Sequence, residues 1–217
     1  MTLAENRLMQ LEPTLDRDTE RARAYESTMD GYISKGYPRK LSDAEAASKT
    51  DKTWYLPHHA VSNPNKPGKI RVVFDAAASY KSTSLNDQLV SGLHLLNNLV
   101  GVVLRFRLQE VAITADIEAM FHQVRVSQQD QTALRFLWRG PNRNRPSDVY
   151  QMQSTIFDAK PSPCSASYCL RKTATDNQDD YDRATVETVL RDFCMDDLLK
   201  SVPSNSCQGV ASALPSS

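Results

Sequence analysis

The sequence has no excess of charge of either sign and no long hydrophobic run. Its 26 Lys and Arg residues balance 26 Asp and Glu residues, so the net charge gives no evidence for nucleic-acid binding, and any such surface must be local. No apolar segment approaches the ~20 residues that a membrane span requires. Residues 1–20 contain acidic side chains and no apolar core, which excludes a signal peptide and predicts an intracellular protein with no membrane partner.

Cysteine is scarce and is not spaced for zinc. The four cysteines, Cys164, Cys169, Cys194 and Cys207, form no C-x-x-C pair, and no histidine follows them at zinc-finger spacing. We therefore expect reduced, structural thiols. Hydrophobic residues make up 40% and charged residues 24% of the 217 residues, which is ordinary for a globular protein of one or two domains. No internal repeat is visible.

The first half of the sequence predicts a helical lead-in followed by a β-hairpin. Leucines three and four residues apart predict a helix within residues 5–35, and the polar residues 39–52 indicate a linker. The Pro- and Gly-rich run 63–68 predicts a turn with basic residues at its tip and rim. Short strands are expected on both sides of this turn and before it, at residues 54–56, 60–62 and 70–74.

The second half alternates strands with helices, and hairpins occur among them. This order indicates an α+β fold with a mostly antiparallel sheet. Residues 204–217 are small and polar without periodicity, and they predict an irregular end. Helices are expected over residues 84–100, 161–172 and 182–192. Strands are expected over residues 111–115, 134–138, 148–153 and 193–195.

Three aspartates carry the chemical argument. Asp196 and Asp197 interrupt the apolar run 193–199, and Asp116 ends another apolar strand. Apolar neighbours predict burial, and a buried carboxylate is costly unless it is paired or coordinates a cation. Because adjacent side chains of a strand point to opposite faces, both acids can serve one site only if the chain turns there. If the two strands are neighbours, the acids converge as ligands for Mg²⁺ in a two-metal site for nucleotidyl transfer.

A simpler interpretation exists for the same residues. A lone Asp-Asp is more often a solvated turn or a helix cap, and many strands end in Asp. The apolar context of both acidic positions argues against this alternative, and so do the motifs around them.

The segment Phe193-Cys194-Met195-Asp196-Asp197 resembles the aromatic-x-Asp-Asp box of reverse transcriptases, and residues 115–121 resemble their first catalytic motif. Further phrases resemble the polymerase of BEL/Pao-type LTR retrotransposons and occur in the order of that family. These phrases are residues 54–61, 71–76, 84–87 and 105–107. A chance match to one Asp-Asp box would not bring the others with it.

The resemblance runs from about residue 5 to residue 202, and it implies the fingers and palm of the right-hand polymerase fold. These would occupy residues 53–203, after a lead-in and linker at 1–52 and before an irregular tail at 204–217. The implied activity is RNA-directed DNA polymerisation, which extends a DNA primer on an RNA or DNA template with two Mg²⁺ or Mn²⁺ ions. Deoxynucleoside triphosphates and primer–template would be the partners, in the cytoplasm, a virus-like particle or the nucleus.

The resemblance also implies roles for individual residues. Asp116, Asp196 and Asp197 would bind the metal ions, and the carbonyl of Ile117 would complete their shell. Phe121 would be the aromatic gate beneath the incoming sugar. The amides of Ala119 and Met120 would hold the triphosphate, and Lys66 and Arg71 would neutralise its charge. Ser162, Pro163 and Met195 would contact the template and the primer.

Several of these residues have structural alternatives. Phe121 in an apolar segment is often a core residue, Lys66 and Lys69 fit a solvated turn, and Arg71 in a strand fits a solvent-facing position. The pair His58-His59 suggests a metal site, but a solvated or hydrogen-bonded pair is favoured because no third ligand is placed. An arginine-rich stretch beside Trp138 fits either phosphate contact or a solvated strand and loop. Its members are Arg135, Arg139, Arg143 and Arg145.

The sequence departs from the family pattern at two positions. Cys194 stands where the box usually has Tyr, and Asp158 stands where Gly usually follows Phe, adding a negative charge near the triphosphate. Either change is expected to weaken turnover. No thumb, connection, RNase H or integrase region follows the box in this sequence and no protease precedes it, so we expect these regions as partners and weak primer–template binding without them.

Three hypotheses follow from these observations. The first is a reverse transcriptase fragment that retains metal-dependent nucleotidyl transfer. The second is a catalytically inactive remnant or domesticated domain that at most binds nucleic acid. The third is an unrelated acidic module for metal binding or protein interaction, which the several phrase matches disfavour.

Overall fold

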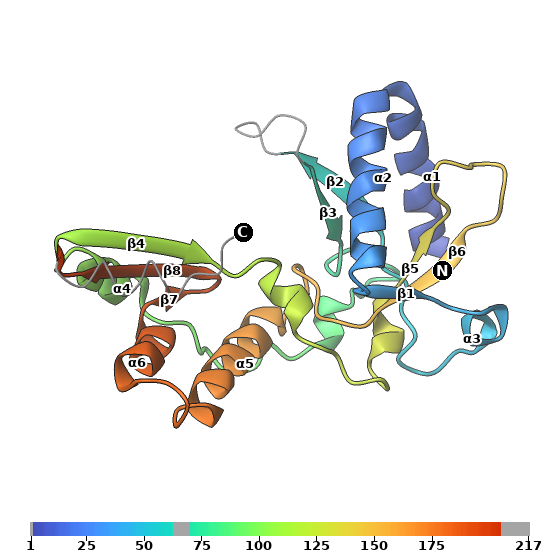
Figure 1. Cartoon of the computed structure of the whole chain (residues 1–217). Helices are drawn as coiled ribbons and strands as arrows, with labels where there is room; N and C mark the ends of the chain where they lie inside the picture. The colour runs from blue at the N-terminus through green and yellow to red at the C-terminus, as the bar shows by residue number, and fades with distance from the viewer. Residues whose placement is uncertain (1, 63–69, 205–217) are drawn as a thin grey trace. The chain divides into compact units, whose positions relative to one another are not determined.

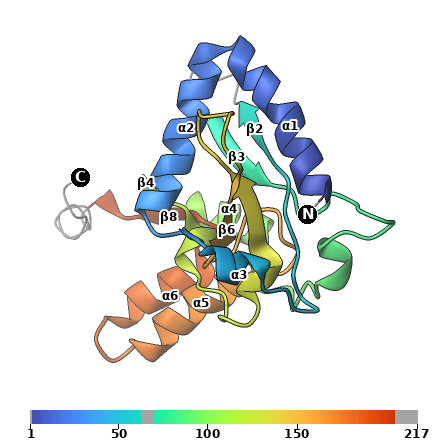
Figure 2. The ribbon, with the colours of Figure 1, turned by 90° about the vertical axis from the view of Figure 1, so that its right-hand side faces the viewer.

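The computed structural model describes residues 2–62 and 70–204 and divides the chain into two compact units. Unit 1 comprises residues 1–91 and 121–162, and unit 2 comprises residues 92–120 and 163–217. Figure 1 shows the elements of both units along the chain, and Figure 2 gives a second view of each. In the described part of the chain, no helix is long and apolar enough to cross a membrane.

Unit 1 is built from a helical hairpin and two small antiparallel sheets. Its helices are α1 Thr2–Arg17, α2 Thr19–Ser34 and α3 Asp43–Ala47, with 3₁₀ turns η1 Asn86–Gln88, η3 Gln131–Leu134 and η2 Met120–Gln123, whose first residue belongs to unit 2. Its strands are β1 Pro38–Lys40, β2 His58–Ser62, β3 Ile70–Phe74, β5 Arg135–Trp138 and β6 Asp148–Met152. The sheets have the orders β1-β6-β5 and β2-β3.

The two N-terminal helices belong to the hydrophobic core of unit 1. Figure 1 shows α1 and α2 side by side, and Asp18 between them caps α2 by accepting a hydrogen bond from the Arg21 amide at 3.0 Å. Leu15 and Tyr25 are fully buried in the same cluster as Phe136. The helical lead-in that the leucine spacing predicted is confirmed, and it is packed into the unit rather than standing apart.

His58 is a core residue of unit 1. Its Nε2 lies 2.8 Å from the carbonyl of Leu137, which can only accept, so Nε2 carries the proton. Its Nδ1 therefore accepts from the hydroxyl of Tyr25 at 2.5 Å. The preference for a hydrogen-bonded histidine over a metal ligand is confirmed for His58. Burial lowers the pKa of His58 to about 4.

This depressed pKa predicts a stability change in mild acid. In the unfolded chain His58 titrates near its ordinary pKa of 6.5, so between pH 6.5 and about 4 the unfolded state takes up a proton that the folded state does not. The free energy of unfolding of unit 1 should therefore fall by roughly 3 kcal/mol between pH 6.5 and about 4. Below about pH 4, His58 should cause no further loss. Urea unfolding followed by Trp fluorescence reads unit 1, since Trp54 and Trp138 are the chain's only tryptophans.

The matched variant for this measurement is His58→Gln, whose amide can both donate to Leu137 and accept from Tyr25. His122 also has a lowered pKa because it is buried, and it contributes in the same direction in both proteins. The difference in pH dependence between the two proteins is therefore the share of His58. An identical pH dependence would contradict the assignment of His58 as a neutral core residue.

The arginine-rich stretch is bonded within the protein. Arg135 is 3% exposed and donates to the carbonyls of Glu45 and Ser48 at the end of α3 at 3.2 and 2.9 Å. Neither alternative considered from the sequence, phosphate contact or solvation, describes this buried side chain. The other three members form ion pairs, Arg139 with Glu12, Arg143 with Asp16 and Arg145 with Asp148. The stretch therefore connects α1 and α3 to the β1-β6-β5 sheet of unit 1.

The described residues of unit 2 form the second three-stranded sheet and three helices. Its strands are β4 Val111–Asp116, β7 Phe193–Cys194 and β8 Asp197–Val202, in the order β4-β8-β7 and antiparallel throughout. Its helices are α4 Leu99–Phe106, α5 Ser162–Asp176 and α6 Arg183–Arg191. Figure 1 shows β4 and β8 side by side along their length. This sheet carries the three aspartates that the sequence singled out.

Some predicted elements are wrong. The helix expected over residues 84–100 is a 3₁₀ turn at 86–88 followed by irregular chain, and α4 begins only at Leu99. Gly92 has φ +76°, which a helix does not accept, and Asn98 is the N-cap, accepting from the Gly101 amide at 3.1 Å. The expected linker 39–52 includes the end of β1 and all of α3, and the expected strand 54–56 is a single bridge at Tyr55.

Candidate active site

Strands β4 and β8 place two of the predicted acids directly opposite each other. In the antiparallel register Asp116 pairs with Asp197, at the end of β4 and the start of β8. Side chains directly opposite in such a pair project from the same face, with Cβ atoms about 4.5–5.5 Å apart. The sequence predicted that the acids converge if their strands are neighbours. The register shows that β4 and β8 are neighbours, so the prediction is confirmed for Asp116 and Asp197.

The third acid, Asp196, lies in the turn between β7 and β8. Cys194 of β7 pairs with Asp197 of β8, so Met195 and Asp196 form a two-residue hairpin turn. Met195 has φ +60°, as such a turn requires. The Ile117 amide donates to the Asp196 carbonyl at 3.0 Å and joins this turn to the end of β4. The predicted turn at the Asp-Asp pair is confirmed.

The prediction that these acids are buried is wrong. Asp116 and Asp197 are exposed and Asp196 is half-buried. Thr114, which precedes Asp116 on the same face of β4, is exposed as well, so this part of the sheet is open to water. A solvated carboxylate needs no cation for stability, so the case for a metal rests on geometry and donor chemistry instead.

The donor set suits a hard cation. Within residues 2–62 and 70–204, no group of three or more His, Cys, Asp and Glu side chains is arranged to hold a metal ion. Mg²⁺, however, is usually bound through one or two carboxylates and completes its shell with water and substrate phosphate oxygens. The opposed pair Asp116 and Asp197 fits that pattern. Asp196 is not part of the opposed pair and adds one more carboxylate nearby.

The segment after Asp116 forms a tight turn. Its Met120 amide donates to the Ile117 carbonyl at 3.2 Å, and Ala119 has φ +50°. The Ile117 carbonyl, predicted to bind the metal, and the Met120 amide, predicted to bind the triphosphate, are therefore bonded to each other. The carbonyl keeps a second lone pair for a cation, but the amide must be shared or released before it can bind phosphate.

In unit 1, Phe121 lies in an aromatic and cationic cluster. Its ring meets the ring of Phe157 edge-to-face with centroids 5.4 Å apart, and the Arg71 guanidinium lies 5.4 Å from the centroid of Phe157. Arg71 is exposed and Phe157 is 57% exposed, so these side chains form a surface rather than a core. Lys66, the other predicted triphosphate contact, lies outside the described residues, as does Lys69.

Sequence reasoning missed Phe157 as a candidate site residue. It follows the irregular residues 155–156 and begins a turn. Its exposure is set by the fold, so the local sequence carried no signal for it. Phe121 is held in place by its backbone, since the Thr155 hydroxyl donates to its carbonyl at 2.5 Å. The cluster therefore has one ring on an anchored main chain and one exposed ring.

The residues predicted to contact template and primer are less open. Ser162 is fully buried, and its hydroxyl donates to the Ile156 carbonyl at 2.6 Å. That side chain holds the turn before α5 and is not available to a nucleic acid. Pro163 and Met195 are half-buried, and their predicted contacts stay predictions.

Asp158 has a structural partner that the sequence did not indicate. Its carboxylate accepts from the amides of Ala76 and Ala77 at 2.9 and 3.3 Å, and its carbonyl accepts from the Asn86 side chain at 2.9 Å. Ala76 is fully buried. The carboxylate therefore ties the chain after β3 to the turn that follows Phe157.

Replacing Asp158 with glycine should for this reason destabilise unit 1. The change leaves the buried Ala76 amide without its acceptor, at a cost of about 1–3 kcal/mol. Asp158→Asn keeps an acceptor oxygen and should cost less than half of that. Urea unfolding read by Trp fluorescence measures both. Equal stability of the glycine variant and the unsubstituted protein would show that this anchor contributes nothing, and the residue would then matter only through its charge.

The comparisons with known proteins concern the fold. No protein-family model and no curated protein matches the sequence. The foamy viral protease-reverse transcriptase dRH in complex with double-stranded DNA is similar with a TM-score of 0.57 and 15% identity, over 85% of this chain and 26% of that one. The foamy viral protease-reverse transcriptase in complex with double-stranded DNA gives 0.56 and 16%, over 87% and 32%. This chain thus spans about a quarter to a third of the length of those proteins, and it has a reverse-transcriptase-like α+β fold with a palm-like sheet flanked by helices.

Proposed function

We propose that this chain is the fingers and palm region of a reverse transcriptase of BEL/Pao-type LTR retrotransposon origin. In this proposal it extends a DNA primer on an RNA or DNA template inside the cell. The observation that carries the proposal is the opposition of Asp116 and Asp197 beside the Asp196 turn. The fold similarity and the ordered sequence phrases support it, as does the double-stranded DNA bound by the two similar proteins.

In the proposed reaction, Asp116 and Asp197 would hold Mg²⁺ or Mn²⁺, with Asp196 and the Ile117 carbonyl beside them. Two such ions, when bound, would supply activation of the primer 3′-hydroxyl and stabilisation of the leaving pyrophosphate. The resemblance assigns Phe121 to the incoming sugar and Arg71 to the triphosphate, and Phe157 would add a second ring surface in unit 1. The residues thus divide into oxygen donors in unit 2 and a ring-and-cation surface in unit 1.

The second candidate is an inactive remnant that binds nucleic acid without extending it. The observation that favours it is Cys194, which lies directly beside Asp197 across β7 and β8. A thiol there gives the primer end no ring to lie against. The metal-binding acids are retained in both candidates, so only a measurement of turnover separates them.

Primer extension tests the proposal. The full chain is incubated with an RNA template, a labelled DNA primer, deoxynucleoside triphosphates and Mg²⁺ or Mn²⁺, and a gel shift with the same duplex measures binding. Extension that is lost in Asp196→Asn supports the polymerase. Binding without extension supports the remnant, and Cys194→Tyr then tests whether the missing ring is the defect. Absence of both binding and extension contradicts both candidates.

A further inference from the structure

A buried carboxylate lies directly before the Asp-Asp hairpin. Asp192 follows α6, precedes β7 and is 8% exposed. Its amide donates to the Thr188 carbonyl at 2.9 Å and ends the helix, while its carbonyl accepts from the Leu199 amide of β8 at 3.0 Å. Its position is thus fixed by both α6 and β8. A carboxylate buried to this extent is stable only with well-placed partners.

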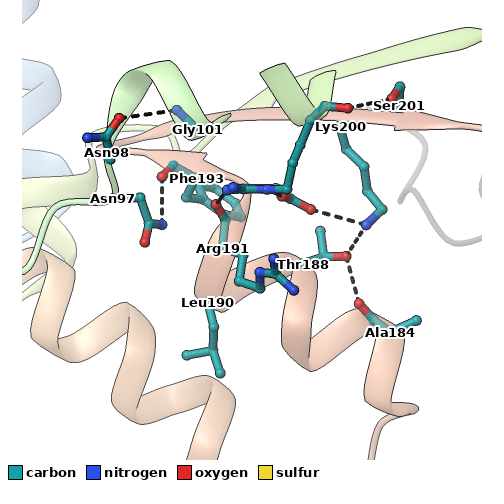
Figure 3. Close-up of polar contacts among 12 residues, drawn as sticks. Asn97, Asn98, Gly101, Ala184, Thr188, Leu190, Arg191, Phe193, Lys200 and Ser201 are labelled. Carbon is teal, nitrogen blue, oxygen red and sulfur yellow. Dashed lines mark hydrogen bonds and ion pairs between the residues drawn. The ribbon is translucent and has the colours of Figure 1, made fainter. Parts of the chain in front are cut away.

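Two cations from different elements provide those partners. Arg105 of α4 donates from Nε to Asp192 Oδ1 at 2.9 Å, and Lys200 of β8 lies with Nζ 3.2 Å from Asp192 Oδ2. Figure 3 shows Lys200 also reaching the Thr188 hydroxyl, which in turn reaches the Ala184 carbonyl within α6. These bonds are 2.6 and 2.7 Å long. We call Arg105, Asp192 and Lys200 the Asp192 cluster.

Arg105 contacts the chain on both sides of the hairpin turn. Its Nη2 donates to the Arg191 carbonyl, two residues before β7. Its own carbonyl accepts from the Ser201 hydroxyl of β8 at 2.9 Å. One residue of α4 is therefore bonded to the chain entering β7 and to the strand leaving the turn.

The outer strand β7 has further contacts that do not involve the Asp192 cluster. β7 has only two paired residues and is the outer strand of its sheet, and so short a hairpin is marginal on its own. Asn97 donates to the Phe193 carbonyl at 3.0 Å, and Arg171 of α5 lies 3.4 Å from both Asn97 Oδ1 and the Leu190 carbonyl. The contact between Asn97 and Phe193 is visible in Figure 3.

We propose that the Asp192 cluster is a positioning device that fixes the Asp196-Asp197 turn against the end of β4, and so sets metal affinity and the rate of the chemical step. The cluster encloses the turn in sequence, because Asp192 precedes Asp196 by four residues and Lys200 follows Asp197 by three. Ligands for a metal must be held within about 0.5 Å, which a two-residue strand cannot ensure alone. The metal part of this inference rests on the proposed function, whereas the positioning part does not.

The test compares Asp192→Asn with Asp176→Asn in the full chain. Asp176 of α5 forms an exposed ion pair with Lys172 in the same unit and is the matched control. Asp192→Asn should weaken Mn²⁺ binding, measured by calorimetry, by roughly 10-fold or more, as supporting partners of metal ligands do. It should lower kcat for extension by a similar factor and leave KM for the deoxynucleoside triphosphate unchanged. The control should change none of these quantities.

A second variant separates positioning from simple loss of fold. Arg105→Lys keeps a charge beside Asp192 but loses the fork that also holds the Arg191 carbonyl, so it should give an intermediate loss of Mn²⁺ affinity. Hydrogen exchange of the amides in residues 193–202 should speed up in both variants, while exchange in α5 stays unchanged. Faster exchange throughout unit 2 would mean that the variants unfold the unit, and the positioning role would be rejected.

The outcomes for the two proposals are distinguishable. If the unsubstituted chain binds Mn²⁺ and Asp192→Asn binds it equally well, the positioning role is wrong and the proposed function stands. If the unsubstituted chain binds no Mn²⁺, the proposed function fails, and the exchange of residues 193–202 decides the positioning role alone. Unchanged exchange in Asp192→Asn overturns the inference in either case.

Discussion

The Asp116→Asn variant is expected to lose primer extension and Mn²⁺ binding together, by more than about 100-fold. Groups that only support a metal ligand cost 10–100-fold when removed, so loss of a ligand itself should cost more. Asp116 is exposed and pairs directly with Asp197 across the sheet. Extension assays and calorimetric titration with Mn²⁺ measure the two losses.

The same variant should make the metal-free protein slightly more stable. Like charges directly opposite each other on neighbouring strands destabilise a sheet, by up to about 1 kcal/mol. Asp116→Asn removes that repulsion, so exchange of the Leu199 amide in unit 2 should slow without metal. Asp179→Asn, an exposed aspartate between α5 and α6, is the control and should change neither property. A metal-free Asp116→Asn protein that is less stable would show that Asp116 has a structural role instead.

Local patterns predicted the strands that carry the site. Residues 111–115 and 70–74 alternate or accumulate β-branched residues, and both are strands in the structure. The turn at Asp196 was predictable because adjacent strand residues cannot share a face. What the pattern could not give was the register. Asp116 opposes Asp197 rather than Asp196 only because β4 pairs with β8, whose first residue lies 81 positions after Asp116.

Two of the failures arise because burial and pairing depend on distant segments, whereas the third is local. Apolar neighbours made the acid pair look buried, but that face of β4 is uncovered in unit 2. Leucines at 89, 93 and 96 suggested a helix, although the positive φ of Gly92 prevents one. The arginine-rich stretch looked unpaired because the ion-pair partners of Arg139 and Arg143 lie in α1, far away in the sequence. Glu12, for example, lies 127 positions before Arg139.

The second large effect is expected from Glu12→Ala, which should destabilise unit 1 by about 3–5 kcal/mol. Glu12 of α1 and Arg139 form a bidentate pair, Nε to Oε1 at 2.6 Å and Nη2 to Oε2 at 2.5 Å. Their side chains are only 8% and 18% exposed. Removing Glu12 leaves the largely buried charge of Arg139 with the Arg145 carbonyl as its remaining acceptor. Urea unfolding followed by Trp fluorescence measures the loss in unit 1, since Trp138 is the neighbour of Arg139.

The helix supplies its own control for this prediction. Asp16, four residues further along α1, pairs with Arg143 at 3.4 Å, but its side chain is 56% exposed, so Asp16→Ala should cost no more than about 1 kcal/mol. The double variant Glu12→Leu with Arg139→Met should recover most of the stability, because an apolar pair carries no desolvation cost. If Glu12→Ala and Asp16→Ala cost the same, the α1 helix is held by its leucines alone. If the double variant is as unstable as Glu12→Ala, the loss comes from packing and not from an uncompensated charge.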